Sequence, residues 1–184
     1  MFKSIESDCK RYWLLEYTPD NPMSVVKAFS KYVSTKHKSE VENYTKNGIQ
    51  HHFEKNEALD CQNWIETQIK NLFNHFGYKK KITGLSSKWS IKYSAGGWQG
   101  LHAHGREYNH TKIITAVLYF NSPSSSIGDG NLITVWPKED IVTWSEISPS
   151  PGKLVVMSGN LVHGVYPTTT DRNIIVMDFF IDDK

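Results

Sequence analysis

Cysteine is scarce in this sequence, with only Cys9 and Cys61 among 184 residues. Two thiols so far apart in the chain form neither a disulfide framework nor a zinc-binding pattern. The first residues lack the apolar core of a secretory signal, and no apolar run is long enough to cross a bilayer. We therefore expect a protein of the reducing cytoplasm that has no membrane partner.

Strong charge of either sign is absent as well. The formal net charge is +2 with histidine neutral, and the nearest thing to a basic block, Lys79-Lys80-Lys81, is interpreted as a solvated loop after a helix. The sequence therefore carries no clear nucleic-acid signature. With 39% hydrophobic and 22% charged residues, the composition is that of an ordinary folded protein. The length fits a single domain over residues 1–184.

Residues 1–80 are predicted to form a mainly helical support region. One helix begins at Asn21-Pro22, a capping residue followed by proline at the first helical position. A second covers Asp60–Phe76, with Asp60 as its N-cap and Gly77 as its end. Its apolar residues recur at helical spacing, so we expect this face to pack against a sheet. They are Ile65, Ile69, Leu72, Phe73 and Phe76. Residues 35–59 give no clear pattern.

Residues 81–184 are predicted to form the β core. From Trp89 onward the apolar residues alternate in the manner of half-buried strands. Short strands separated by glycine- and proline-rich turns suit a sandwich or jelly roll better than a parallel α/β sheet. Of these we expect a double-stranded β-helix, the cupin-like jelly roll. The fold class is thus mainly β with N-terminal helices. The candidate strands are Lys88–Ser94, Gly100–His104, Lys112–Asn121, Asn131–Trp136, Ile141–Trp144, Lys153–Met157, Leu161–Val165 and Asn173–Ile181.

Three histidines in the β-rich half are candidate metal ligands. His102 and His104 lie two apart, so in a strand both side chains project from the same face. His163 follows about sixty residues later, ahead of Gly164. A facial set of three ligands on iron leaves positions open for substrate and dioxygen. The other histidines are interpreted as packing or surface residues: His37, His51, His52, His75 and His110.

Arg172 follows nine residues after His163, at the head of the apolar strand Asn173–Ile181. An arginine so placed is most often a surface charge at a strand edge. Buried, its planar fork would match a carboxylate bidentately. It could then hold the far carboxylate of a diacid such as 2-oxoglutarate.

Several motifs together resemble those of the prolyl-hydroxylase-like 2-oxoglutarate/Fe(II)-dependent oxygenases. The resemblance extends from about Phe73 to Ile181. A subgroup of these oxygenases that is common in marine bacteria and their phages is also similar, in the combination of Trp89, Gly96-Gly97, His102 and His104. The matching segments, in order, are Tyr93-Ser94-Ala95-Gly96 continuing to His102, Ala116–Asn121, Gly128–Leu132, and His163-Gly164-Val165-Tyr166-Pro167 followed by Arg172.

The resemblance implies roles for individual residues. His102 and His163 are implied as catalytic iron ligands, Arg172 and Tyr119 as the clamp on the far carboxylate of 2-oxoglutarate, and Tyr93 as a neighbour of the iron end of this cosubstrate. The implied reaction is a hydroxylation that uses Fe(II), 2-oxoglutarate and dioxygen. Its substrate is unidentified, a peptidyl residue such as proline being one option.

The sequence departs from the family at one ligand. The acidic ligand of the family falls at His104, which would give a three-imidazole site, unless Asp129 or Glu107 supplies a carboxylate. Four further residues are candidates to line the substrate side, although aromatic core packing also explains most of them. They are Trp89, Trp98, Gln99 and Trp136.

Two other classes of function remain open from the residues. The three histidines also resemble the sites of cupin dioxygenases, which need no 2-oxoglutarate, and Arg172 and Tyr119 would then be structural. A metal-free jelly-roll binding module, for example for carbohydrate, would instead use its tryptophans as the binding surface. Fold analogy does not choose among these classes.

Overall fold

The computed structural model describes residues 1–6, 12–33, 45–104, 112–122, 128–138 and 141–183. Cys9, His37, Glu107 and His110 lie outside these ranges. The elements in chain order are β1 (Phe2–Glu6), β2 (Trp13–Tyr17), α1 (Pro22–Phe29), the 3-10 turn η1 (Ser30–Tyr32), β3 (Thr45–His52), α2 (Leu59–His75), β4 (Lys80–His102), β5 (Ile113–Tyr119), β6 (Leu132–Lys138), β7 (Ile141–Ile147), β8 (Leu154–Ser158), β9 (Val162–Val165) and β10 (Arg172–Asp183).

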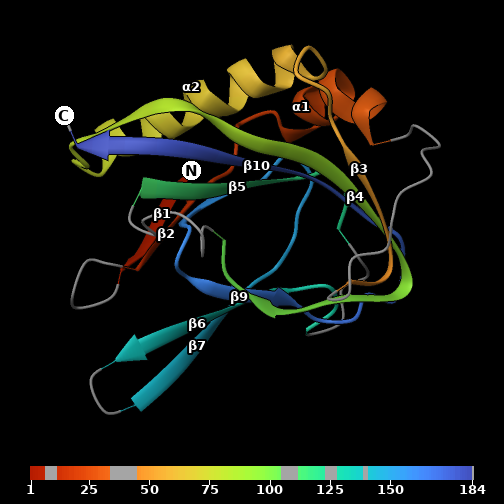
Figure 1. Cartoon of the computed structure of the whole chain (residues 1–184). Coiled ribbons are helices and arrows are strands. Elements are labelled where there is room, and N and C mark those ends of the chain that lie inside the picture. The colour runs from red at the N-terminus through yellow and green to blue at the C-terminus, as the bar shows by residue number, and fades with distance from the viewer. Residues whose placement is uncertain (7–11, 34–44, 105–111, 123–127, 139–140, 184) are drawn as a thin grey trace.

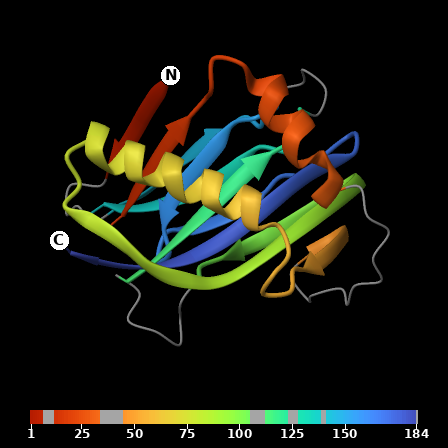
Figure 2. The same cartoon turned by 90° about the horizontal axis from the view of Figure 1, so that it is seen from above.

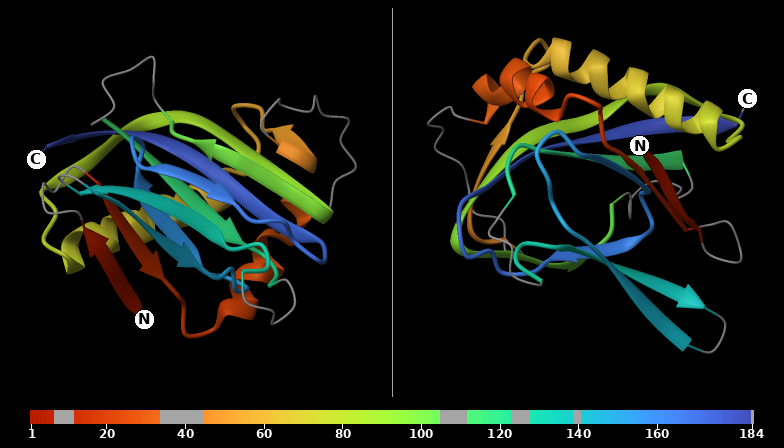
Figure 3. Two further views of the ribbon diagram at one scale, coloured as in Figure 1. Left: turned by 90° about the horizontal axis from the view of Figure 1, so that it is seen from below. Right: turned by 180° about the vertical axis from the view of Figure 1, so that it is seen from behind.

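The described strands form one curled antiparallel sheet. Their order is β1-β2-β8-β5-β10-β4-β9-β6-β7, with β3 paired to β4 off this path. The sheet bends over so that β9 and the β6–β7 hairpin lie below β5 and β10, while α1 and α2 cover the upper side (Figure 1). The views from below and behind show the same curl (Figure 3). The prediction of a mainly β fold with N-terminal helices is confirmed.

Strand β4 connects the two layers of this curled sheet. Its first part pairs with β10 from Lys80 to Tyr93, whereas Gln99 and His102 near its end pair with β9. The sequence predicted two strands separated by a turn at Gly96-Gly97, which was wrong because the strand continues through this bend. A Cβ on Gly97 would lie 2.7 Å from the Ser94 carbonyl oxygen. Only glycine therefore fits where β4 turns from one layer into the other.

The helices begin and end largely as their sequence signals predict. The Asn21 side chain caps α1 by accepting a hydrogen bond from the Ser24 amide, at 3.2 Å, and Gly77 follows α2 with a φ of +73°. The prediction that Asp60 caps α2 was wrong, since Ala58 occupies that position in a left-handed conformation. Asp60 lies instead in the first helical turn, where it accepts a hydrogen bond from Tyr32 at 2.5 Å.

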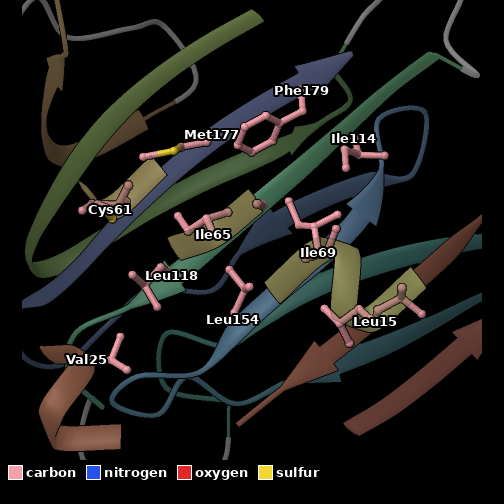
Figure 4. Close-up of a cluster of buried hydrophobic side chains, with 14 of the residues drawn as sticks. Leu15, Val25, Cys61, Ile65, Ile69, Ile114, Leu118, Leu154, Met177 and Phe179 are labelled. Carbon is pink, nitrogen blue, oxygen red and sulfur yellow. The ribbon is translucent and has the colours of Figure 1, made fainter. Parts of the chain in front are cut away.

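Helix α2 packs its apolar face on the outer side of the sheet. It runs across the upper layer in the view from above (Figure 2). Buried side chains of α2 interlock with alternate side chains of β5, β8 and β10 (Figure 4). Burial of one such side chain contributes about 1.5–3 kcal/mol relative to its exposure. The prediction that this face packs against a sheet is confirmed.

A second core fills the space inside the curl. Along β10, Ile175 and Met177 belong to the outer core, while Ile174 and Val176 belong to the inner one. Because strand side chains alternate between faces, Arg172 and Asp178 share the inner face with Ile174. The inner core is formed by side chains of β2, β4, β5, β6, β8, β9 and β10 with Ile147 and Leu161.

The first half of the chain also supplies strands that the sequence reading did not predict. β2 pairs with β8, and β3 comes from the polar stretch to which no pattern was assigned and pairs with β4. Their cross-strand partners, more than their own composition, determine these strands. None of the helices in the described ranges is both long and apolar enough to span a membrane.

Candidate metal centre

His102 and His163 face each other across two neighbouring strands. They are direct partners in the antiparallel pairing of β4 with β9, and their ring centroids lie 4.4 Å apart. Side chains at directly opposed positions project from the same face of a sheet. The two imidazoles therefore converge on the inner side of the curl.

His104 completes the cluster from just beyond the end of β4. Its ring centroid lies 5.1 Å from that of His102 and 5.1 Å from that of His163. Its backbone amide donates a hydrogen bond to the Gly159 carbonyl at 2.8 Å, which fixes the chain there. One nitrogen from each ring lies within 4.8 Å of the other two, an arrangement able to hold a metal ion.

The hydrogen bonds of the three rings select the nitrogen that faces the cluster. Nδ1 of His102 lies 2.8 Å from the Gly100 carbonyl, and Nδ1 of His163 lies 2.9 Å from the Leu161 carbonyl. Nδ1 of His104 lies 2.8 Å from an Asp178 carboxylate oxygen. Each acceptor favours a proton on Nδ1, which leaves the lone pair on Nε2. Nε2 of each ring is thus the atom suited to coordinate a metal.

Electrostatics keep the innermost ring neutral. Burial, together with the neighbouring His102 and His104, holds the pKa of His163 well below its ordinary value. Only the neutral imidazole has a lone pair to give to a metal. The environment of His163 therefore favours the form that coordinates.

Gly164 lets β9 approach β4 closely enough for this pairing. A Cβ at this position would lie 3.0 Å from the Gln99 carbonyl oxygen and 3.2 Å from the Leu101 side chain. A side chain here would push the two strands apart beside His163. The glycine that follows the distal histidine thus has a packing reason.

A second polar group lies on the inner face around Arg172. Arg172 on β10 is the direct cross-strand partner of Tyr93 on β4. Its guanidinium carbon lies 5.1 Å from the Tyr93 ring centre and 5.2 Å from the Tyr119 ring centre. All three side chains are 0% exposed. The expectation of a surface charge, common for a strand-edge arginine, does not hold here.

The guanidinium of Arg172 is buried beside the rings of Tyr93 and Tyr119. Its three nitrogens have no hydrogen-bond partner in the described part of the chain, and neither has the Tyr119 hydroxyl. Burial raises the pKa of Tyr119, with the charge of Arg172 opposing that rise, so the phenol stays protonated and able to donate. An unpaired buried cation costs several kcal/mol. The arrangement fits an anion that Arg172 and Tyr119 bind together.

Other candidate residues lie in different surroundings. The carboxylate of Asp129 accepts hydrogen bonds from the Thr169 amide and hydroxyl, and Asp129 does not join the histidine cluster. Glu107 lies outside the described residues. His51, His52 and His75 also stay apart from the cluster, in line with their interpretation as packing or surface residues.

The four candidates for the substrate side divide into two groups. Trp89 stacks on His104, with centroids 5.8 Å apart and planes 17° apart, and Gln99 accepts a hydrogen bond from the Tyr93 hydroxyl at 2.9 Å. Both thus touch residues of the candidate site. Trp136 is buried and donates to Thr134, whereas Trp98 is 38% exposed.

Asp178 is the site residue that sequence reasoning missed. It is buried and contacts the ring of His104 through both carboxylate oxygens. The period of two could have found it, since counting from Arg172 along β10 places Asp178 on the inner face. A buried acidic residue in a predominantly apolar strand is itself unusual.

Solved structures show which fold this is. No protein-family model matches the sequence, and a comparison with curated proteins gives no match. A prolyl-4-hydroxylase of Pseudomonas putida aligns with a TM-score of 0.62 and 18% identity, over 91% of this chain and 91% of its own. A viral collagen prolyl hydroxylase from Paramecium Bursaria Chlorella virus-1, in a 2OG complex, aligns with a TM-score of 0.57 and 14% identity, over 98% and 94%. The non-heme alpha ketoglutarate dependent epimerase SnoN from nogalamycin biosynthesis aligns with a TM-score of 0.67 and 8% identity, over 91% and 78%.

The chain has the fold of 2-oxoglutarate oxygenases. The predicted double-stranded β-helix is therefore confirmed. The chain covers most of the length of each of these proteins, so the likeness includes the N-terminal helices as well as the β core. At identities this low it concerns the fold, and the site residues must carry the functional argument.

Proposed function

We propose that this protein is a 2-oxoglutarate- and Fe(II)-dependent dioxygenase that hydroxylates a substrate still to be identified. The observation that carries the proposal is the buried Arg172, whose guanidinium nitrogens have no hydrogen-bond partner among the described residues. A structural role, which the cupin alternative would give this residue, does not account for a buried guanidinium without a hydrogen-bond partner, because such a cation is costly. The far carboxylate of 2-oxoglutarate would satisfy it.

In this proposal His102, His104 and His163 hold the iron through Nε2. When bound, the iron and 2-oxoglutarate supply the oxidising chemistry that dioxygen drives. The protein contributes a fixed set of imidazoles, each oriented by an acceptor on Nδ1. The lone pairs of the three rings point toward one another, so they favour the binding of a single metal ion near His102, where β4 ends.

Arg172 and Tyr119 hold the far carboxylate of 2-oxoglutarate in the proposal. Arg172 offers its planar fork, and Tyr119 offers a hydroxyl whose burial favours the protonated form. Tyr93 packs against Arg172 and donates to Gln99, so the pair stiffens the wall between the clamp and the histidines. The complete burial of these side chains excludes water from the clamp.

For the substrate we propose only a class, a peptidyl residue such as proline. Two of the matched structures are prolyl hydroxylases, which supports a peptidyl residue such as proline. The third is an epimerase, so the fold also serves other reactions.

We further propose that residues 1–184 form one domain, because the outer core joins α1 and α2 to the sheet. A cytoplasmic location stays a prediction from the sequence.

The cupin alternative keeps one specific observation in its favour. All three clustered residues are imidazoles, as in the cupin dioxygenases that the sequence also resembles. In that alternative Arg172 and Tyr119 would be structural, although neither side chain has a hydrogen-bond partner among the described residues. The two functions therefore differ in whether 2-oxoglutarate binds beside the metal.

The deciding experiment is an anaerobic titration. Fe(II) is added to the protein, followed by 2-oxoglutarate, and the visible absorption is recorded. Chelation of the metal by the keto acid gives a weak charge-transfer band, whereas glutarate, which lacks the keto group, gives none. If iron binds but 2-oxoglutarate neither binds nor gives the band, the result contradicts the oxygenase proposal and favours the cupin alternative.

A further inference from the structure

The three histidines differ in what lies behind them. His102 and His163 each direct Nδ1 at the backbone carbonyl two residues earlier in the chain. His104 alone directs Nδ1 at a carboxylate, with distances of 3.0 Å and 2.8 Å to the two oxygens of Asp178. The side chains of His104 and Asp178 are 11% and 10% exposed. A charged acceptor in so dry a place interacts more strongly than a carbonyl.

The carboxylate of Asp178 is held from both neighbouring strands. Thr115 on β5 and Ser87 on β4 are its direct cross-strand partners. The Thr115 hydroxyl donates to one carboxylate oxygen at 2.7 Å, and the Ser87 hydroxyl donates to the other at 3.3 Å. Three adjacent strands thus fix the position and orientation of one carboxylate.

The three histidines alone would leave the charge of a bound metal ion uncompensated. Three neutral imidazoles bring no negative charge to a divalent cation, and no carboxylate of the described residues joins the cluster as a ligand. Asp178 places a carboxylate directly behind one of the rings. A carboxylate bonded to the outer nitrogen of a ligating imidazole increases the donor strength of the inner one.

We propose that Asp178 is a positioning residue of the metal site. It holds His104 with Nε2 toward the metal and supplies, through the ring, the negative charge that the three ligands lack. This inference rests on the proposed function, which takes the three histidines as the ligands. A purely structural Asp178 would affect folding stability but not the affinity for metal.

The test is metal affinity, measured with Co(II) by visible absorption and by calorimetric titration of the metal-free protein. Asp178→Asn keeps the shape and removes the charge, and it should weaken Co(II) binding by about ten- to a hundredfold. Asp129→Asn is the matched control, because Asp129 and Asp178 are both 7% exposed and Asp129 bonds to Thr169 instead. The control should bind Co(II) like the wild type.

A double-mutant cycle shows whether the effect passes through the ring. In a His104→Ala background, Asp178→Asn should cause little further loss, because the imidazole it orients is gone. An equal loss in both backgrounds would overturn the inference. Thr115→Val, which removes one hydroxyl that orients Asp178, should give a smaller loss and serves if Asp178→Asn does not fold.

Different results would contradict the metal site and the role of Asp178. A wild-type protein that binds no Co(II) or Fe(II) would overturn the proposed metal site, and the role of Asp178 with it. Normal binding by the wild type and an unchanged affinity in Asp178→Asn would overturn only the role of Asp178.

Discussion

Arg172 and Tyr93 stand directly opposite each other on β10 and β4, with the guanidinium carbon 5.1 Å from the centre of the phenol ring. The ring face stabilises the cation but offers no hydrogen-bond acceptor to its nitrogens. The pair therefore keeps the guanidinium buried and still able to bind an anion. This relationship gives the first prediction.

Arg172→Ala should raise the concentration of 2-oxoglutarate needed for half-maximal binding by about thirtyfold or more, because the loss of one partner of a desolvated charge pair costs roughly 2–5 kcal/mol. Binding of Fe(II) or Co(II) should be retained. The measurement is titration of the metal-loaded, anaerobic protein with 2-oxoglutarate. Lys92→Ala is the control, since Lys92 lies beside Tyr93 and makes an exposed ion pair with Asp171. Equal affinities in Arg172→Ala and the wild type would exclude the clamp.

His163→Ala should abolish metal retention. His163 is the most buried of the three rings, and its removal leaves two ligands that are both close to the end of β4. Elemental analysis of the purified protein gives the metal stoichiometry. His75→Ala, a change on the exposed end of α2, should keep the wild-type value. Unchanged stoichiometry in His163→Ala would show that His163 is not a ligand.

Gly164→Ala should destabilise the protein and weaken the metal site together. The added methyl group would lie 3.0 Å from the Gln99 carbonyl oxygen, and overpacking of this kind costs about 1–3 kcal/mol. Gly84→Ala is the matched control in β4, where a Cβ would meet only the Phe180 side chain at 3.8 Å. Thermal unfolding and Co(II) titration of both variants test this. Wild-type behaviour of Gly164→Ala in both measurements would refute it.

Cys61 should be inert to thiol reagents in the folded protein. Burial of Cys61 on the face of α2 that packs against the sheet raises the pKa of its thiol far above the usual range, so the reactive thiolate is scarce even in mildly alkaline buffer. A Cys9→Ser variant leaves Cys61 as the only thiol to be counted. Labelling should then follow unfolding by denaturant. Complete labelling under native conditions would mean that α2 opens from the sheet.

The sequence revealed the parts of the site that depend on short-range spacing. The spacing of His102 and His104 predicted that their rings lie together, which they do although β4 ends at His102. Arg172 stands out as a charge at the head of an apolar strand. The strands from Ile113 onward were also found with small errors at their ends, since alternation and turn residues mark them locally. For these elements the local pattern and the final fold agree.

The features that were missed depend on contacts between distant segments. β3 is a strand because it pairs with β4, and its own residues are too polar to reveal this. Ala58 rather than Asp60 precedes α2, and Asp60 instead bonds to Tyr32, a contact absent from any local window. The link between Asp178 and His104 needs the curl of the whole sheet, so no spacing along the chain predicts it.

Strand β4 carries residues of both the proposed anion-binding site and the histidine cluster. Tyr93, which packs on the clamp, and His102, which belongs to the histidine cluster, lie on this one strand, on either side of the bend at Gly96-Gly97. The span between the anion-binding end and the metal-binding end is therefore set within a single continuous piece of backbone. Under the proposed function, we expect a diacid shorter or longer than 2-oxoglutarate to bind more weakly, because its two ends must contact Arg172 and the metal at once. A change in the angle of the bend would alter which cosubstrate fits, even if every contacting side chain stayed the same.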